Sequence, residues 1–170
     1  NLSSIYFENH NKTTIDAQAL NTLFPKLKVA NFYMCTISNL NELISITNLE
    51  LSNCLYTLDE LCSLGNNLKS LQLNNDSVVC EDLNRLKNLK SLKKLENLCI
   101  YRREDVEDTN PFFDLAIELP KLKSFFFTES SGSMKRCFIS YLIHLMESGL
   151  VNTSIANKCR KFIERNDLHN

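Results

Sequence analysis

The 170-residue chain contains no tryptophan, only three glycines and only three histidines. At an average usage of about 7%, roughly 12 glycines would be expected in a chain of this length. Their scarcity argues against glycine-rich phosphate-binding loops and against glycine-dependent hairpins. The sequence also has no apolar run that approaches the roughly 18 residues of a membrane-spanning helix, and no signal-peptide pattern. The sequence therefore predicts a domain without a membrane-spanning helix and without a glycine-rich loop that binds a nucleotide phosphate.

Charge and cysteine usage narrow the class further. The formal net charge is -1, which argues against a general nucleic-acid binder because such proteins carry an excess of positive charge. The number of cysteines is odd and no two are spaced as CxxC, which argues against a disulfide scaffold and a structural zinc site. Reduced thiols in a cytosolic or nuclear protein are the favoured interpretation. The seven are Cys35, Cys54, Cys62, Cys80, Cys99, Cys137 and Cys159.

No pattern in the sequence indicates catalysis. None of His10, His144 and His169 has a Cys, Ser or carboxylate at the spacing of a nucleophile and its base. The chain has no GxSxG, HExxH or P-loop motif. Cys99 is the one thiol predicted on an open surface, where an inert thiol is favoured over a reactive one. We therefore expect a protein that is not an enzyme and that has no catalytic residue, cofactor or metal.

Leucine is abundant, with 28 copies, and many of them recur as the pattern L-x-x-L-x-L. The first positions of six successive copies are separated by 25, 19, 22, 27 and 27 residues. Such periodicity indicates a repeat architecture in which each unit stacks on its neighbours. The copies are Leu2-Ile5-Phe7, Leu27-Ala30-Phe32, Ile46-Leu49-Leu51, Leu68-Leu71-Leu73, Leu95-Leu98-Ile100 and Leu122-Phe125-Phe127.

Each copy has a physical interpretation. The two apolar residues of L-x-L point to the same side of a strand because strand side chains alternate. Cys35 and Cys54 follow the strand at a position that suits a small, buried side chain. Between copies the apolar spacing changes to three and four, which predicts helices on the opposite side of the coil. These helical segments are Leu58-Leu61-Leu64, Leu83-Leu86-Leu89-Leu92 and the shorter Leu115-Ile117-Leu119.

The pattern resembles the leucine-rich repeat family over about residues 2 to 130, and its spacing and cysteines are most similar to the intracellular repeats of F-box substrate receptors. The resemblance implies an α/β solenoid with a curved parallel sheet on the concave side and helices on the convex side. An α/β domain with leucine-rich strands is the alternative. The sequence departs from the family's Asn or Cys position at His10, Asp76, Arg103 and Ser130.

The two ends of the repeat region differ. Residues 1–130 are expected to form about six repeats, of which the first is either complete or incomplete, and residues 131–170 a C-terminal cap of two amphipathic helices. Ser133 is a good N-cap for the first of these, and a partner-binding helix pair is the alternative. The chain opens inside a repeat, so we expect a preceding segment or a partner chain to cover the first strand's edge.

The outward positions of the predicted strands are polar, mostly uncharged and interspersed with aromatic residues, a mixture that suits protein recognition. An unused, solvated face is the alternative. The acidic segment 104–120 and the basic run 85–94 are interpreted as solvated features, with docking of a basic peptide as the alternative for the first. The candidate partner-binding residues are Tyr6, Asn31, Tyr33, Glu50, Gln72, Asn74, Tyr101, Arg103 and Phe126.

The predicted function is a non-enzymatic protein-interaction module that binds its partner, a target or a complex subunit, through the concave face and adjoining loops. The resemblance to F-box receptors implies the substrate-recognition part of a ubiquitin ligase. Two alternatives stay open: an adaptor similar to nuclear RNA-export factors, whose late repeats resemble residues 110–122, and the repeat domain of an immune-type receptor.

Overall fold

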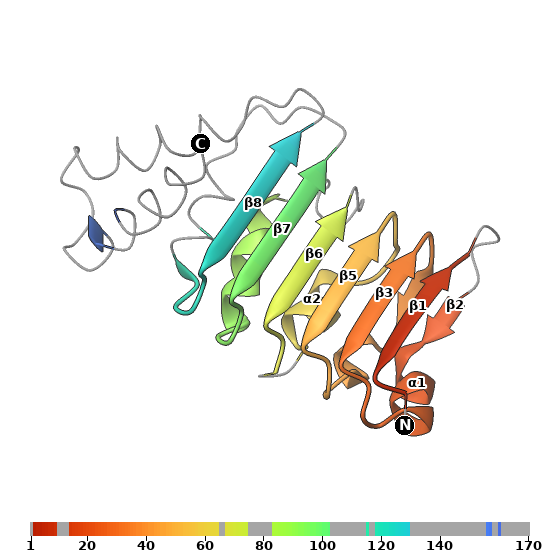
Figure 1. Cartoon of the computed structure of the whole chain (residues 1–170). Coiled ribbons are helices and arrows are strands. Elements are labelled where there is room, and N and C mark those ends of the chain that lie inside the picture. The colour runs from red at the N-terminus through yellow and green to blue at the C-terminus, as the bar shows by residue number, and fades with distance from the viewer. Residues whose placement is uncertain are drawn as a thin grey trace.

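The computed structural model of the chain describes residues 2–9, 14–64, 67–74, 83–102, 115, 118–129, 156, 157 and 160. Its main element is a six-stranded sheet in which spatial order follows chain order and every neighbouring pair is parallel (Figure 1). The predicted α/β class with a parallel sheet is thereby confirmed. The strands are β1 (Ser4–Glu8), β3 (Val29–Tyr33), β5 (Asn48–Ser52), β6 (Ser70–Asn74), β7 (Asn97–Arg102) and β8 (Ser124–Glu129).

The strand register follows the sequence pattern copy by copy. All six L-x-L segments lie in strands of this sheet, and equivalent positions of successive copies are direct partners. Because parallel strands place partnered residues on the same side, the apolar positions form two continuous rows. The first row is Ile5, Ala30, Leu49, Leu71, Leu98 and Phe125, and the second is Phe7, Phe32, Leu51, Leu73, Ile100 and Phe127.

A recurring hydrogen-bond pair fixes the starts of β3, β5, β6, β7 and β8. The backbone N–H groups of Lys28 and Val29 both donate to the carbonyl of Ser3, at 2.8 and 3.0 Å. The same two-to-one arrangement recurs at the start of β5, β6, β7 and β8, with the carbonyls of Lys28, Thr47, Lys69 and Glu96 as acceptors. Units of 19 to 27 residues therefore stay in register, because the length difference lies in the connections between strands.

The bends after β3 and β5 combine a left-handed residue with a buried cysteine. Met34 and Asn53 have φ of 54° and 52°, a region that asparagine tolerates but that strains methionine by about 1 kcal/mol or more. The thiol of Cys54 lies 3.2 Å from the carbonyl oxygen of Phe32, and the thiol of Cys35 lies 3.0 Å from the carbonyl oxygen of Tyr33. Both cysteines are buried, which confirms the prediction of small buried side chains at this position.

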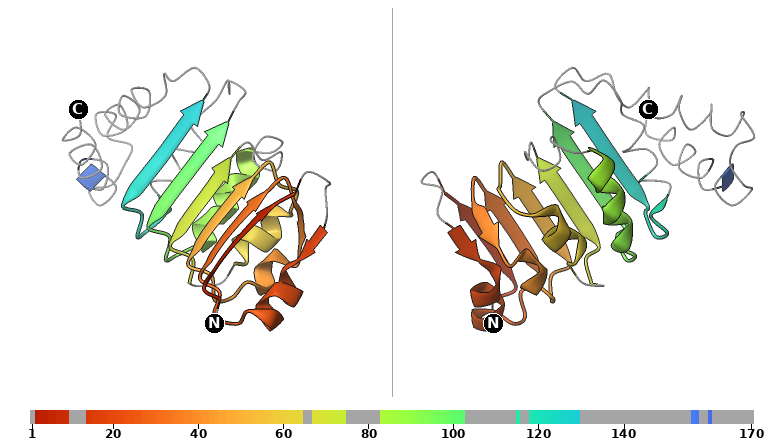
Figure 2. Two further views of the ribbon diagram at one scale, coloured as in Figure 1. Left: turned by 45° about the vertical axis from the view of Figure 1, so that its right-hand side comes forward. Right: turned by 180° about the vertical axis from the view of Figure 1, so that it is seen from behind.

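Four helical segments lie on one side of the sheet (Figure 2). They are α1 (Ala17–Leu23), η1 (Leu40–Glu42), α2 (Leu58–Cys62) and η2 (Leu83–Ser91). The predicted helix at Leu58 is confirmed as α2. The segment from Leu83 is a 3-10 helix, which fits a leucine spacing of three because that helix has 3.0 residues per turn. Of the third predicted helix, Leu115 and Glu118 are helical and residues 116 and 117 lie outside the described residues.

Two short strands and two helical segments, α1 and η1, were not predicted. β2 (Thr14–Asp16) and β4 (Thr36–Ser38) pair in parallel as a separate two-stranded sheet. Each has a single central isoleucine, too short a pattern to indicate a strand. Helix α1 follows β2 directly, and the side chain of Asp16 caps it by accepting a 3.0 Å hydrogen bond from the Gln18 N–H.

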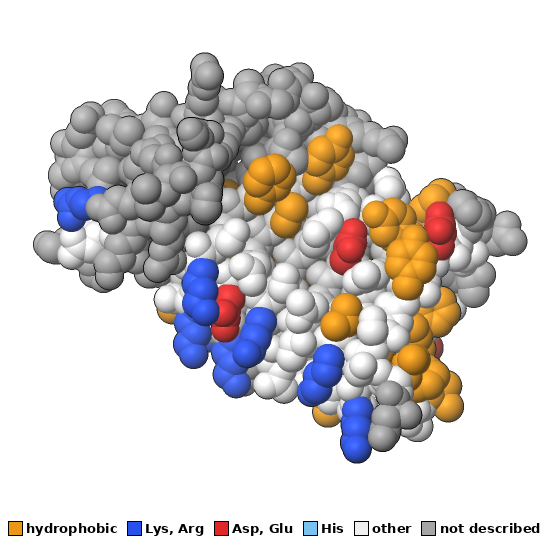
Figure 3. All heavy atoms as spheres, in the orientation of Figure 1, with side chains coloured by type: hydrophobic (Ala, Val, Ile, Leu, Met, Phe, Trp, Pro, Cys, Tyr) orange, Lys and Arg blue, Asp and Glu red, His pale blue; other side chains and the backbone are white. Residues whose placement is uncertain are grey.

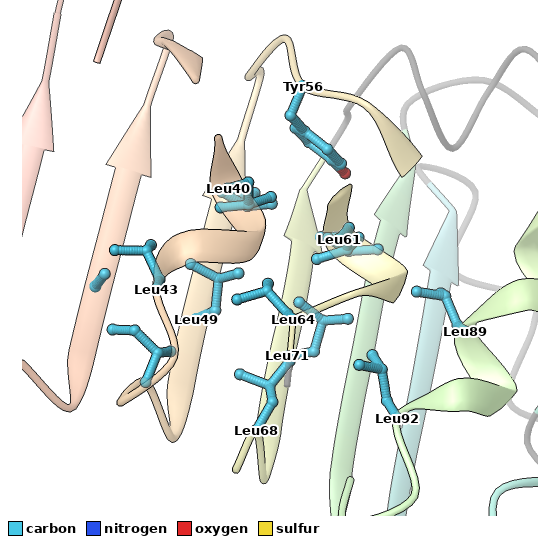
Figure 4. Packing of buried hydrophobic residues seen from close by; sticks show 14 of the residues in the cluster. Leu40, Leu43, Leu49, Tyr56, Leu61, Leu64, Leu68, Leu71, Leu89 and Leu92 are labelled. Atoms are coloured by element: carbon cyan, nitrogen blue, oxygen red, sulfur yellow. The ribbon is translucent and has the colours of Figure 1, made fainter. Parts of the chain in front are cut away.

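The core lies between the helical segments and the inner side of the sheet (Figure 4). Leucines of η1, α2 and η2, among them Leu40, Leu61 and Leu89, pack against strand leucines such as Leu49 and Leu71 in one buried cluster. The first position of the sequence pattern is buried in the second to fifth copies, whereas Leu2 is exposed and Leu122 is half-buried. One continuous core therefore joins the successive units.

Little of the expected C-terminal cap falls within the described residues. Of the range 131–170, only Ala156, Asn157 and Arg160 are described, and all three are helical. Strand β1 occupies one end of the sheet order, as the sequence predicted, and its Ile5 and Phe7 are half-buried. No helix in the described ranges has the length and apolar character needed to traverse a bilayer.

Candidate protein-binding face

The outward side chains of the six strands form a surface, here called the strand face, on the side of the sheet away from the four helical segments (Figures 1 and 2). Their burial alternates with that of the core-facing residues in β3 and β6, and in β5 up to Ser52, which is buried. The members with described side chains are Ser4, Tyr6, Glu8, Val29, Asn31, Tyr33, Asn48, Glu50, Ser52, Ser70, Gln72, Asn74, Asn97, Cys99, Tyr101, Ser124 and Phe126.

The register brings all but one of the predicted binding residues together in two neighbouring rows of the strand face. One row runs Tyr6, Asn31, Glu50, Gln72, Cys99 and Phe126, and the next contains Tyr33, Asn74 and Tyr101. With strands about 4.8 Å apart, six strands give each row a span of roughly 24 Å. Arg103 lies outside the described residues.

Glu50, on β5, is the centre of a hydrogen-bond cluster that joins three strands. Its Oε1 accepts hydrogen bonds from the amide of Asn74 at 3.0 Å, the amide of Gln72 at 3.1 Å and the phenol of Tyr33 at 3.5 Å. Gln72 also donates to Asn74 at 3.4 Å. All four side chains are half-buried, so the carboxylate is held in place while the surface above it stays accessible.

Tyr6 extends this cluster to β1 through its contact with Tyr33. The rings of Tyr6 and Tyr33 have centroids 5.8 Å apart and are tilted by 39°. The phenol of Tyr6 donates to Glu8 Oε2 at 3.1 Å, while that of Tyr33 faces Glu50. Desolvation, followed by the hydrogen bond to Glu8, raises the pKa of Tyr6 and keeps it a hydrogen-bond donor. With 57% of its surface exposed, Tyr6 is open to contact by a partner.

At the opposite end of the strand face, the described side chains include two exposed aromatic residues and no charged residue. Phe126 is 53% exposed and Tyr101 is 37% exposed. Tyr101 lies on β7, the strand of Cys99, and Phe126 lies on the neighbouring strand β8. Figure 3 shows hydrophobic side chains in two groups across this face, with acidic side chains near one of them. Large aromatic side chains exposed on a regular sheet are typical anchors of protein interfaces.

Cys99 lies half-buried between Gln72 and Phe126 in the first row. Burial, and after it the negative charge of Glu50, raises the pKa of its thiol above the ordinary value of 9.0. A thiol that stays protonated at neutral pH is a weak nucleophile. The geometry therefore favours a packing role for Cys99 on this face.

We expect alkylation of Cys99 by iodoacetamide at pH 9.0 to be slower in the native chain than in the urea-unfolded chain, because the native pKa lies above that pH. The rate of alkylation is measured by mass spectrometry of the tryptic peptide 95–102, which contains Cys99. Glu50→Gln is expected to accelerate the reaction by removing the nearby negative charge. A native rate that reaches half its maximum below pH 9.0 would contradict the raised pKa.

The sequence analysis missed a basic margin at the edge where the strands begin. The residue immediately before the strand is lysine in β3, β6 and β8, namely Lys28, Lys69 and Lys123, and all three are exposed. Lys123 pairs with Glu96, and its hydrogen bond lowers the pKa of that carboxyl. Figure 3 shows Lys and Arg side chains gathered along this edge. The signal in the sequence was a lysine at the same position of three copies.

Two open depressions lie off the strand face. One of about 510 Å³ lies between α2 and η2 and is lined by residues including Asp59, Cys62 and Lys90. The other, of about 520 Å³, lies near α1 and is lined by Leu2, Leu23, Phe24, Pro25 and Lys26. Among the described side chains, no three His, Cys, Asp or Glu residues gather in a metal-binding arrangement.

Comparison with known proteins does not assign the chain to a family. No protein-family model matches the sequence, and no curated protein matches it significantly.

Proposed function

We propose that this chain is a non-enzymatic protein-interaction module of the leucine-rich repeat type, which binds a protein partner through the strand face. The observation that carries the proposal is the composition of that face. It presents amide, hydroxyl and aromatic groups over six adjacent strands, and exposed Tyr6, Tyr101 and Phe126 stand among them. Interfaces use such aromatic side chains as anchors surrounded by polar groups.

The repeat assignment is supported by three independent regularities. Equivalent pattern positions are strand partners in every copy. The same hydrogen-bond pair recurs at the start of five strands, and helical segments connect strands on one side only in the described part of the chain. Stacked units of this kind present a broad surface of parallel strands, which repeat proteins use for binding.

The chemistry of the face favours recognition over catalysis. Its charged groups in the described residues are Glu8 and Glu50, which lie on different strands with β3 between them. Glu50 Oε1 is occupied by three donors from the protein, and Cys99 is kept in its thiol form. A site organised by hydrogen bonds of this kind orients a bound group and does not supply a nucleophile.

The F-box resemblance extends the proposal to the substrate-recognition part of a ubiquitin ligase in the cytosol or nucleus. The free thiols of Cys35 and Cys99 fit a reducing compartment. In this proposal the strand face holds the target protein, and the ligase core is bound by another part of the full-length protein.

Affinity capture of the full-length protein, followed by mass spectrometry and by affinity measurement with the recovered partner, tests the proposal. Tyr33→Ala combined with Tyr101→Ala is expected to weaken the partner's binding by about 100-fold, since each hot-spot aromatic contributes roughly tenfold or more. The melting temperature is expected to change little, because both side chains are at least partly exposed.

The matched control removes two exposed apolar side chains from the helical side of the sheet, Leu23 and Ile44, which are 69% and 57% exposed. Leu23→Ala combined with Ile44→Ala is expected to leave the affinity unchanged. A partner that is lost from the control but retained by the tyrosine variant would place the binding surface on the helical side and overturn the proposal.

A further inference from the structure

Glu50 has an unusual distribution of hydrogen bonds for a half-buried carboxylate. The donors from Tyr33, Gln72 and Asn74 all converge on Oε1. Within the described part of the chain, no hydrogen bond or ion pair is directed to Oε2. The three donors are neutral, so they orient the carboxylate without compensating its charge.

The surroundings of Glu50 are also suited to a positive charge. Among the described side chains of the strand face, Glu8 and Glu50 are the charged members, and no lysine, arginine or histidine belongs to that set. The rings of Tyr6 and Tyr33 lie together beside them, 5.8 Å between centroids. Phenol rings next to carboxylates attract cations through both the ring face and the negative charge.

The lysines of the basic margin lie at the far edge of the same face. Lys28 and Lys69 precede the strands, whereas Glu50 is the third residue of β5 and Glu8 is the last residue of β1. Lys28 donates to the carbonyl of Ser45, at 3.1 Å, which holds it at this margin. The face is thus polarised along the strand direction, and a basic group in a partner is repelled from one edge and attracted to the other.

We propose that Glu50, together with the rings of Tyr6 and Tyr33, receives a basic side chain, preferably arginine, from an extended segment of the protein partner. A guanidinium is planar, so it can stack on a tyrosine ring while it donates to Glu50 Oε2. This inference rests on the proposed function, because it names the chemistry that the strand face recognises.

Phage panning of a random peptide library on the full chain tests the inference. Selected peptides are expected to share one Arg or Lys. Their affinities are then measured by fluorescence anisotropy for the wild-type chain, Glu50→Gln and the control Glu118→Gln. Glu118 is a half-exposed residue whose carboxylate pairs with Lys90 outside the strand face. Glu50→Gln keeps an acceptor for the three donors, and a thermal melt checks that it folds.

Glu50→Gln is expected to weaken binding by about tenfold or more, the usual effect of losing a hydrogen bond between charged groups, and Glu118→Gln is expected to leave it unchanged. A peptide in which citrulline replaces the shared arginine is expected to lose the same factor with the wild-type chain. Glu50→Gln and the citrulline peptide combined are expected to reduce the affinity little more than either change alone, because both remove the same interaction.

The outcomes separate this inference from the proposed function. Peptides that require Tyr33 and Tyr101 but share no basic residue, or that bind Glu50→Gln as well as wild type, overturn the inference and leave the function standing. A selection that yields no peptide dependent on Tyr33 and Tyr101 contradicts both.

Discussion

Leu71→Asp is expected to unfold the chain. Leu71 is the second residue of β6, is 1% exposed and lies between Leu49 and Leu98 in the strand register. The substitution removes a buried leucine, which costs about 2–5 kcal/mol, and leaves an unpaired carboxylate among leucines of the core. Together these two costs are comparable to the whole free energy of unfolding of a domain, which is about 5–15 kcal/mol. Far-ultraviolet circular dichroism and a thermal melt measure the result.

The matched control introduces the same residue on the other side of the sheet. Asn48 is exposed at the start of β5, and Asn48→Asp changes an amide to a carboxylate of nearly the same shape. We expect the free energy of unfolding of this variant to lie within about 0.5 kcal/mol of the wild-type value, as for most surface substitutions. A Leu71→Asp variant that is soluble and melts like the wild-type chain would show that the assigned register and core are wrong.

The sheet could be predicted from the sequence because its signal is redundant. Each strand has two apolar residues at alternate positions, and the same pattern occurs six times, so an ambiguity in one copy is resolved by the others. The connections lack this redundancy. Strands β2 and β4 each have one buried or half-buried isoleucine, Ile15 and Ile37, and become strands because they pair with each other across more than twenty residues of chain.

The geometry of the helical segments was predictable only in part. The leucines of η2 recur at every third residue, which the sequence analysis interpreted as a helix without distinguishing its type. In the structure the segment is a 3-10 helix that ends at Ser91, and Leu89 within it and Leu92 directly after it are buried. A leucine spacing of three fits this tighter helix, but the leucines from Leu58 to Leu64 have the same spacing and α2 is an α-helix, so the spacing alone does not determine the helix type.

Alternation along the strands was enough to place the candidate residues on one face, since side chains alternate in any strand. It did not reveal that Glu50 unites Tyr33, Gln72 and Asn74, because the four residues belong to three different repeats. Their meeting depends on the register between strands and on the side-chain conformations. Glu8 lies on the strand face but was not among the candidate binding residues, because its hydrogen bond with Tyr6 is a contact within one strand, without a counterpart in other copies.

Phe32→Ala is expected to destabilise the chain by about 3–5 kcal/mol, the usual cost of removing a buried phenylalanine side chain. Phe32 on β3 is fully buried, and its ring stacks on Phe7 of β1 with centroids 6.0 Å apart. The loss therefore weakens the attachment of the end strand as well as the core. Chemical denaturation with urea, followed by circular dichroism, gives the change in the free energy of unfolding.

Phe126→Ala is the counterpart that links stability to function, since the same atoms are removed from the opposite side of the sheet. Phe126 is 53% exposed on the strand face, so little apolar surface returns to water and we expect a change below about 1 kcal/mol. The same variant is expected to weaken partner binding, which Phe32→Ala affects only through unfolding. Equal destabilisation by the two variants would mean that Phe126 belongs to the core, and would remove the aromatic end of the strand face from the proposed interface.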